Sequence, residues 1–226
     1  MSFTKDDTTF ASNPGGVVIS ANKYLSYIGL TRSPKLFYRL LFFFSDSFLF
    51  KHFKNNPIVY DWISKKEQFI SGCINPTIVL NKDKGLIATF TNLTFNGGRP
   101  TPVIKISKEE LHLIKNVRVA NGQRLSSVAV FYRNTHPDEN FWSDFNPKIA
   151  NCFTNDTEVC NRALTSLTHE SFECLQQGLD QVWDKNKIGL YHVQLDDSLV
   201  LAAYQVHCVN SQKAPTTSSV NIEALL

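Results

Sequence analysis

The sequence predicts an α+β fold: N-terminal helices, a small, curved antiparallel sheet or barrel of about five strands, and two following helices. Three patterns indicate this fold. Residues 21–70 carry apolar side chains at helical spacing, and residues 73–153 hold short β-branched runs between turns. Residues 155–209 return to mostly helical spacing.

Length and composition allow one large domain or two small ones. The chain has 226 residues, of which 42% are hydrophobic and 12% aromatic, so it can build a proper core. We expect a single domain over residues 21–209. A flexible arm over residues 1–20 precedes it, and a mobile tail over 210–226 follows it.

Three helices are expected before the strands. The first begins near Asn22. The second has Ser33-Pro34 as its start, with serine in the cap and proline at the first helical position, and can run to about Lys54. Asn55-Asn56-Pro57 stops it, and a third helix covers roughly Ile58–Phe69.

Short strands are expected next, because β-branched residues alternate with turn signals. Asn81–Gly85 is a turn that makes the first two strands a hairpin, and Asn121-Gly122 is a strong turn signal before the fourth. The expected strands are residues 77–80, 86–91, 102–106, 125–133 and 149–153.

Two helices follow. Asn155 with Glu158 resembles a capping box for the first, and Thr168 precedes the second. Residues 188–194 read as a strand, and residues 198–209 as an apolar element of unclear type. The expected buried face of the second helix comprises Phe172, Leu175, Leu179, Val182 and Trp183.

The cysteines and the N-terminus bear on the compartment. Five widely spaced cysteines lie next to apolar residues, which favours buried free thiols in a reducing environment. We expect no signal peptide. The apolar stretch 36–50 is about 15 residues long and contains Arg39 and Asp46, whereas a spanning helix needs about 20 apolar residues. The expected location is the cytoplasm.

Charge is unevenly distributed, although the formal net charge is only +3. Residues 21–56 hold six Lys or Arg against Asp46 alone, and residues 156–197 hold eight Asp or Glu against three basic residues. These segments are two solvated faces, or attract each other, or meet different partners. No basic run resembles a nucleic-acid-binding arm, so we expect no nucleic acid.

Motifs for chemistry are absent from the sequence. It contains no Gly-x-Ser-x-Gly, His-x-x-x-His or Cys-x-x-Cys, so no catalytic residue, bound metal or cofactor is predicted. The densest polar loop covers residues 136–144 and is the best candidate for a small ligand or cation. Its candidate ligand-binding residues are His136, Asp138, Glu139 and Asp144.

The predicted helix 34–54 has aromatic side chains around nearly its whole circumference. Such a helix is buried in the core, meets a protein partner or second subunit, or lies on a membrane surface. Basic residues near its ends would suit an anionic membrane. The candidate interface residues are Phe37, Arg39, Phe43, Phe44 and Phe48.

Several short motifs carry a resemblance to a known family. They are Gly72-Cys-Ile-Asn-Pro76, Trp142 with Phe145-x-Pro147, and Gly189-Leu-Tyr191. Over roughly residues 60–195 the chain resembles an uncharacterised bacterial family, domain of unknown function 3239. The resemblance implies a strand-rich domain followed by helices and a bacterial source, and brings no activity, cofactor or catalytic residue.

Two hypotheses for function follow. The first is a non-enzymatic interaction or scaffold protein that uses its aromatic, basic N-terminal helical region to form a homo-oligomer or bind a protein, or to meet a membrane surface. The alternative is an enzyme or a small-molecule or metal binder with its site in the 136–144 loop.

Overall fold

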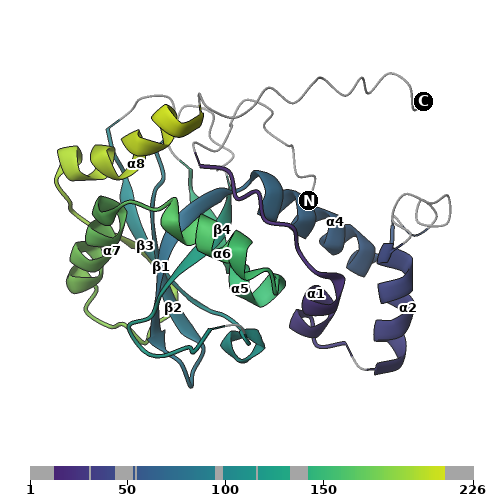
Figure 1. Ribbon diagram of the computed structural model, residues 1–226. Helices are drawn as coiled ribbons and strands as arrows, with labels where there is room; N and C mark the ends of the chain where they lie inside the picture. Colours follow the sequence, from purple (N-terminus) through teal and green to yellow (C-terminus); the bar gives the residue numbers. More distant parts are fainter. Residues whose placement is uncertain are drawn as a thin grey trace.

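A six-stranded antiparallel sheet forms the centre of the structure, in the order β5-β4-β1-β2-β3-β6 (Figure 1). The computed structural model describes residues 13–30, 32–43, 53, 55–94, 99–115, 117–132 and 142–211. The predicted α+β class is confirmed. The strands are β1 (Cys73–Asn81), β2 (Leu86–Asn92), β3 (Pro102–Lys108), β4 (Arg124–Tyr132), β5 (Asp144–Ile149) and β6 (Gly189–His192).

Helices lie at both sides of the sheet. In Figure 1, α7 and α8 lie to the left, and α1, α2 and α4 are grouped to the right. The helices are α1 (Ala21–Tyr27), α2 (Arg32–Phe43), α4 (Pro57–Ser71), α5 (Ala150–Phe153), α6 (Thr157–Thr165), α7 (His169–Gln181) and α8 (Asp197–Ser211), with a short 3-10 helix, η1 (Leu111–Leu113), after β3.

The β1–β2 hairpin forms where the sequence predicts it. Gly85 closes its turn with a φ of 67°, a left-handed conformation that glycine adopts without steric cost. A Cβ at this position would lie 2.5 Å from the carbonyl oxygen of Glu109. The backbone N–H of Glu109 also donates to the carbonyl of Gly85 at 2.8 Å. The turn is therefore fixed against the segment that follows β3.

The sheet is strongly curled. Lys105 of β3 donates to the carboxylate of Asp144, at the start of β5, at 2.8 Å, and to the carbonyl of Phe145 at 2.6 Å. Three strands separate β3 from β5 in the sheet, so a flat sheet would hold them roughly 19 Å apart at about 4.8 Å per strand. The edges of the sheet therefore bend toward each other, as the predicted curved sheet requires.

The enclosed face of the sheet has a polar centre. The hydroxyls of Thr77 and Thr89 lie 2.9 Å apart, and Thr77 donates to Ser127 at 2.8 Å. All three residues are fully buried, so these bonds meet the requirement that a buried hydroxyl has a partner. The network links neighbouring strands β1, β2 and β4 across the inside of the curl.

Helices α7 and α8 cover the opposite face of β1, β2 and β3. The apolar side chains of these strands form one buried cluster with α7. Tyr204 of α8 accepts a hydrogen bond from the backbone N–H of Asn92 at 2.8 Å. The cluster contains Leu86, Ala88, Phe90, Ile104 and Ile106 from the sheet and Phe172, Leu175 and Leu179 from α7.

A second cluster joins α1, α2 and α4. Phe42 of α2 stacks on Trp62 of α4 with ring centroids 4.6 Å apart and planes 8° apart, and Tyr24 of α1 contacts both rings. Asn56 caps α4, because its side chain accepts from the N–H of Ile58 at 3.0 Å. The N-terminal helices therefore pack together through aromatic side chains.

Residues 13–20, which the sequence analysis places in the N-terminal arm, lie extended against the domain. The N–H of Val17 donates to the carbonyl of Phe69 at 3.0 Å, and that of Ser20 to Phe153 at 2.8 Å. Val17 is fully buried. These contacts attach α1 to α4 and α5.

Several detailed predictions are wrong. The predicted strand 149–153 is mostly helix α5, and the true edge strand ends at Ile149. The cap of α6 is Asp156, whose carboxylate accepts from the N–H of Val159, and not Asn155. Trp183 was expected on a buried helical face but is 82% exposed, because α7 ends at Gln181.

Four of the five cysteines lie among the residues whose side chains the structure describes, and these four are buried, as predicted. They are Cys73, Cys152, Cys160 and Cys174. Within the described part of the chain, no helix is long and apolar enough to cross a bilayer.

Candidate functional site

Helix α2 has one face in the core. Leu41 and Phe42 are buried, and Phe42 makes the stacked contact with Trp62. The hydroxyl of the half-buried Tyr38 accepts a hydrogen bond from the side chain of Asn56 at 3.0 Å, which ties α2 to the cap of α4. These side chains fix the orientation of the helix.

The other face of α2 exposes apolar side chains to solvent. Leu36 is 60% exposed, Leu40 54% and Phe43 80%. Their spacing of four and three residues places them on one stripe of the helix, and the half-exposed Phe37 lies beside it. A contiguous exposed apolar patch is one of the surface features that can bind a protein or a membrane, so this stripe is a candidate site.

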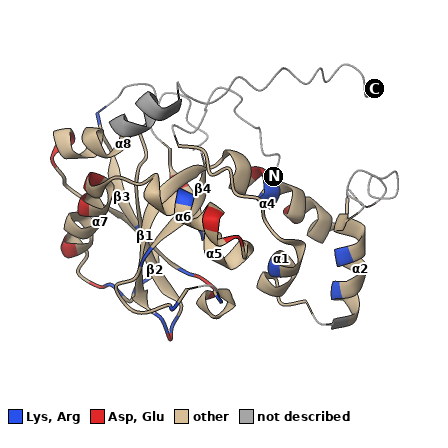
Figure 2. Cartoon of the chain, in the orientation of Figure 1, with Lys and Arg blue, Asp and Glu red and all other residues tan. Residues whose placement is uncertain are grey.

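Positive charge flanks this stripe. Figure 2 shows blue segments on α2 and no red one. No Asp or Glu occurs between residues 21 and 45. Arg39 is exposed, and Lys35 donates to the hydroxyl of Ser26 at 2.6 Å, which holds it near α1. We call Lys35, Leu36, Arg39, Leu40 and Phe43 the α2 surface.

One member of the predicted basic region does not contribute to this surface. Lys23 is buried, and its ammonium group donates to the carbonyls of Leu113 and Asn151. Burial lowers the pKa of Lys23. The positive charge available to a partner therefore lies on α2 rather than on α1.

The structure brings together only some of the predicted site residues. Phe37, Arg39 and Phe43 are exposed on α2, whereas Phe44 and Phe48 lie outside the described residues. Of the predicted ligand-binding loop, His136, Asp138 and Glu139 also lie outside them. Asp144 begins β5 and is engaged by Lys105, so its carboxylate has a structural partner.

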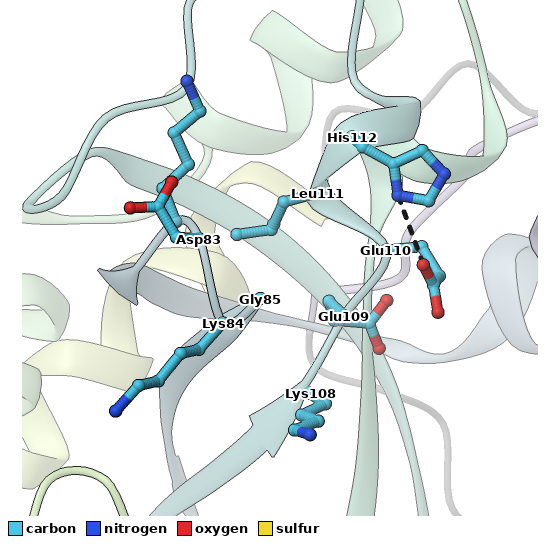
Figure 3. Close-up of a pocket in the computed structure, with 9 residues that line it drawn as sticks. Asp83, Lys84, Gly85, Lys108, Glu109, Glu110, Leu111 and His112 are labelled. Atoms are coloured by element: carbon cyan, nitrogen blue, oxygen red, sulfur yellow. Dashed lines mark ion pairs between the residues drawn. The ribbon is translucent and has the colours of Figure 1, made fainter.

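A shallow hollow of about 310 Å³ lies where the β1–β2 turn meets the segment after β3 (Figure 3). Its charged side chains do not converge. In Figure 3, those of Lys84 and Lys108 extend away from the pair formed by His112 and Glu110, whose Nδ1 and Oε2 atoms are 3.3 Å apart. A catalytic site requires such groups to meet around one reacting atom, and here they do not.

A buried charged cluster lies between α1 and the sheet. Lys148 donates to the carboxylate of Glu109 at 2.8 Å and to the hydroxyl of Tyr27 at 2.7 Å. Burial lowers the pKa of Lys148, but the Glu109 carboxylate and the Tyr27 hydroxyl together outweigh it, so the pKa of Lys148 is raised. Burial raises the pKa of Glu109 and of the Cys152 thiol. A buried thiol whose pKa is raised stays protonated and is a poor nucleophile.

Among the residues that the structure describes, no group of three or more His, Cys, Asp or Glu side chains could hold a metal ion. The α2 surface is the candidate site considered below.

Comparison with known proteins identifies the family. The family model described as "Protein of unknown function (DUF3239)" matches residues 62–182, which is more than half of the chain. The chain belongs to the DUF3239 family. The resemblance noted in the sequence is thus confirmed. No curated protein matches the chain.

A solved structure is similar to the DUF3239 chain over part of its length. It is described as the crystal structure of a "putative membrane protein" from Corynebacterium diphtheriae. The sequences are 16% identical and the TM-score is 0.44, with 53% of this chain and 99% of that chain covered.

The α2 surface lies before the DUF3239 match, which begins at residue 62 within α4. The sequence predicts the helix, but Leu36 and Leu40 are not among the predicted interface residues, because aromatic side chains surround nearly its whole circumference. The signal was the spacing: positions 36, 40 and 43 form one stripe, and positions 38, 41 and 42 form the opposite one.

Proposed function

We propose that this DUF3239 protein is a non-enzymatic interaction protein that binds another surface through α2. The observation that carries the proposal is the pair of opposite apolar stripes on one helix. Tyr38, Leu41 and Phe42 already anchor α2 in the core, so the exposed Leu36 and Leu40 are not needed for that purpose.

Burying the exposed leucines of α2 against a partner would be favourable. A fully buried leucine side chain contributes about 1.5–3 kcal/mol relative to an exposed one. A partner that buries the two exposed leucines of α2 would therefore gain favourable binding free energy from each. The anchored face also means that α2 is already ordered. A partner would not have to supply the free energy that ordering a flexible segment costs.

The location of the protein belongs to the same proposal. We infer a reducing compartment, consistent with the cytoplasm, because the five cysteines are odd in number and widely spaced, and the four whose side chains the structure describes are buried.

Photo-crosslinking tests the proposal directly. A photo-reactive amino acid replaces Leu40 in the full-length protein, and the cross-linked adducts are identified after irradiation in the cells that make the protein. The matched control carries the same amino acid in place of Glu67, an exposed residue of α4. We expect adducts at position 40 that are absent at position 67.

A second variant tests whether a loss of adducts reflects a changed surface rather than misfolding. Leu36→Ser/Leu40→Ser should keep the melting temperature of the wild type, because both side chains are more than half exposed. When a photo-reactive amino acid also replaces Phe43, this double variant should form fewer adducts than a protein that carries the photo-reactive amino acid at position 43 alone. The absence of adducts at position 40, or equal adducts at position 67, would overturn the proposal.

A further inference from the structure

We propose that the partner of the α2 surface is an anionic lipid bilayer. The inference rests on the proposed function and names the surface that α2 meets. Three properties of the α2 surface support it: the sign of its charge, its shortage of uncharged hydrogen-bonding groups, and its position on the outside of the molecule.

Charge restricts the partner first. Arg39 lies beside Leu36 and Leu40 on the exposed side of α2, and residues 21–45 contain no carboxylate. A two-fold contact between two copies would bring the same patch of each copy together, and therefore cation against cation. A partner with negative charge avoids this repulsion and pairs with Arg39.

The scarcity of hydrogen-bonding side chains on α2 favours a bilayer over an acidic protein as the partner. Protein interfaces carry about one hydrogen bond per 100–200 Å² and use polar side chains to form them. From Leu36 to Phe43, the exposed side chains are apolar apart from Arg39. An apolar stripe with a cation beside it suits a helix that lies in an anionic membrane interface.

Position supports the same partner. In Figure 1, α2 lies at the edge of the molecule, on the far side of α1 and α4 from the sheet. The leucines stand on the convex surface of a helix, so a flat surface can reach both at once. The long side chain of Arg39 can extend to lipid headgroups while its methylene groups stay beside the leucines.

Vesicle pelleting of the full-length protein tests the inference. Vesicles contain phosphatidylcholine alone or phosphatidylcholine with phosphatidylserine. We expect the wild type to pellet with the vesicles that contain phosphatidylserine, and to be released as the salt concentration rises. Leu36→Ser/Leu40→Ser should weaken binding at least tenfold. Arg39→Glu changes the charge by two units. It should weaken binding on the order of 25-fold, since each unit charge near the membrane surface contributes roughly fivefold.

Trp183→Ser is the matched control. Trp183 is the most exposed aromatic side chain described away from α2, and the ammonium of Lys187 lies 5.9 Å from the centroid of its ring. It therefore combines an aromatic and a cation as α2 does. We expect this variant to bind like the wild type. If Trp183→Ser lost vesicle binding, the membrane contact would lie near Trp183 and not at α2, and the inference would be overturned.

The remaining outcomes separate the inference from the proposed function. No pelleting with either vesicle, together with protein adducts at position 40, would overturn the lipid inference and leave an α2-dependent protein partner. No pelleting and no adducts would overturn both. Equal pelleting with both kinds of vesicle would overturn the requirement for anionic lipid.

Discussion

Glu109 and Lys148 form an ion pair inside the protein, with Oε1 of Glu109 2.8 Å from Nζ of Lys148. The Glu109 side chain is fully buried; Glu109 follows directly after β3, and Lys148 lies in β5. Tyr27 of α1 joins them through its hydroxyl. The pair therefore connects α1 to two strands, and its disruption should have a large effect on stability.

Removal of one partner should be costly. Lys148→Met leaves the Glu109 carboxyl buried without its cation, which should lower the free energy of unfolding by about 3–5 kcal/mol. The double variant Lys148→Met/Glu109→Leu should recover much of that loss, because neither charge remains. Urea denaturation measures both. A Lys148→Met variant as stable as the wild type would show that the pair does not stabilise the fold.

The ionisation of Tyr27 should make the stability of the protein depend on pH in the alkaline range. Burial raises the pKa of Tyr27 from 10 to about 12, so the folded state retains a proton that the unfolded state loses. The resulting stability is fully present below pH 10 and is lost as the pH rises through about 12. Tyr27→Phe should therefore lose less stability than the wild type between pH 9 and 11, measured by urea midpoints. Tyr60→Phe, on the exposed side of α4, is the control.

Two glycines with a left-handed backbone conformation allow backbone strain to be compared with a steric clash. Gly85 has a φ of 67° and Gly122 a φ of 80°. No atom lies within 4 Å of a Cβ built on Gly122, whereas the carbonyl oxygen of Glu109 lies 2.5 Å from one built on Gly85. Gly122→Ala should cost about 1–2 kcal/mol, and Gly85→Ala clearly more, in thermal unfolding. Equal losses would show that the hairpin moves to relieve the contact.

The two faces of α2 should respond differently to serine. Phe42→Ser removes a buried ring that stacks on Trp62 and should cost about 3–5 kcal/mol. Leu40→Ser changes an exposed side chain and should stay within about 0.5 kcal/mol of the wild type. Calorimetry would compare them, and a large loss for Leu40→Ser would mean that the exposed stripe also supports the fold.

Much of the fold could be predicted because its signals are local. Asn56-Pro57 sets the start of α4, and Thr168 caps α7 by accepting from the N–H of Ser171. The β1–β2 turn is likewise coded by its own residues. Strand β5 begins before the predicted strand 149–153, and its position depends on pairing with β4; its Pro147 is tolerated because β5 is at the edge of the sheet.

Features that depend on distant residues could not be predicted. Lys23 was counted with the surface charges, but its partners are carbonyls 90 and 128 positions away. The candidate surface was only partly predicted, for the same reason. Composition showed that the helix is aromatic and basic, but only contacts with Tyr24 and Trp62 determine which side faces outward.

The extended segment before α1 has a consequence for the order of synthesis. Ser20 donates to the carbonyl of Phe153, and Lys23 bonds to that of Asn151. A ribosome must therefore translate well past the middle of the message before the first helix finds its permanent site. Until then the aromatic N-terminal region emerges without its docking surface, which is when a nascent-chain chaperone would be most useful to it.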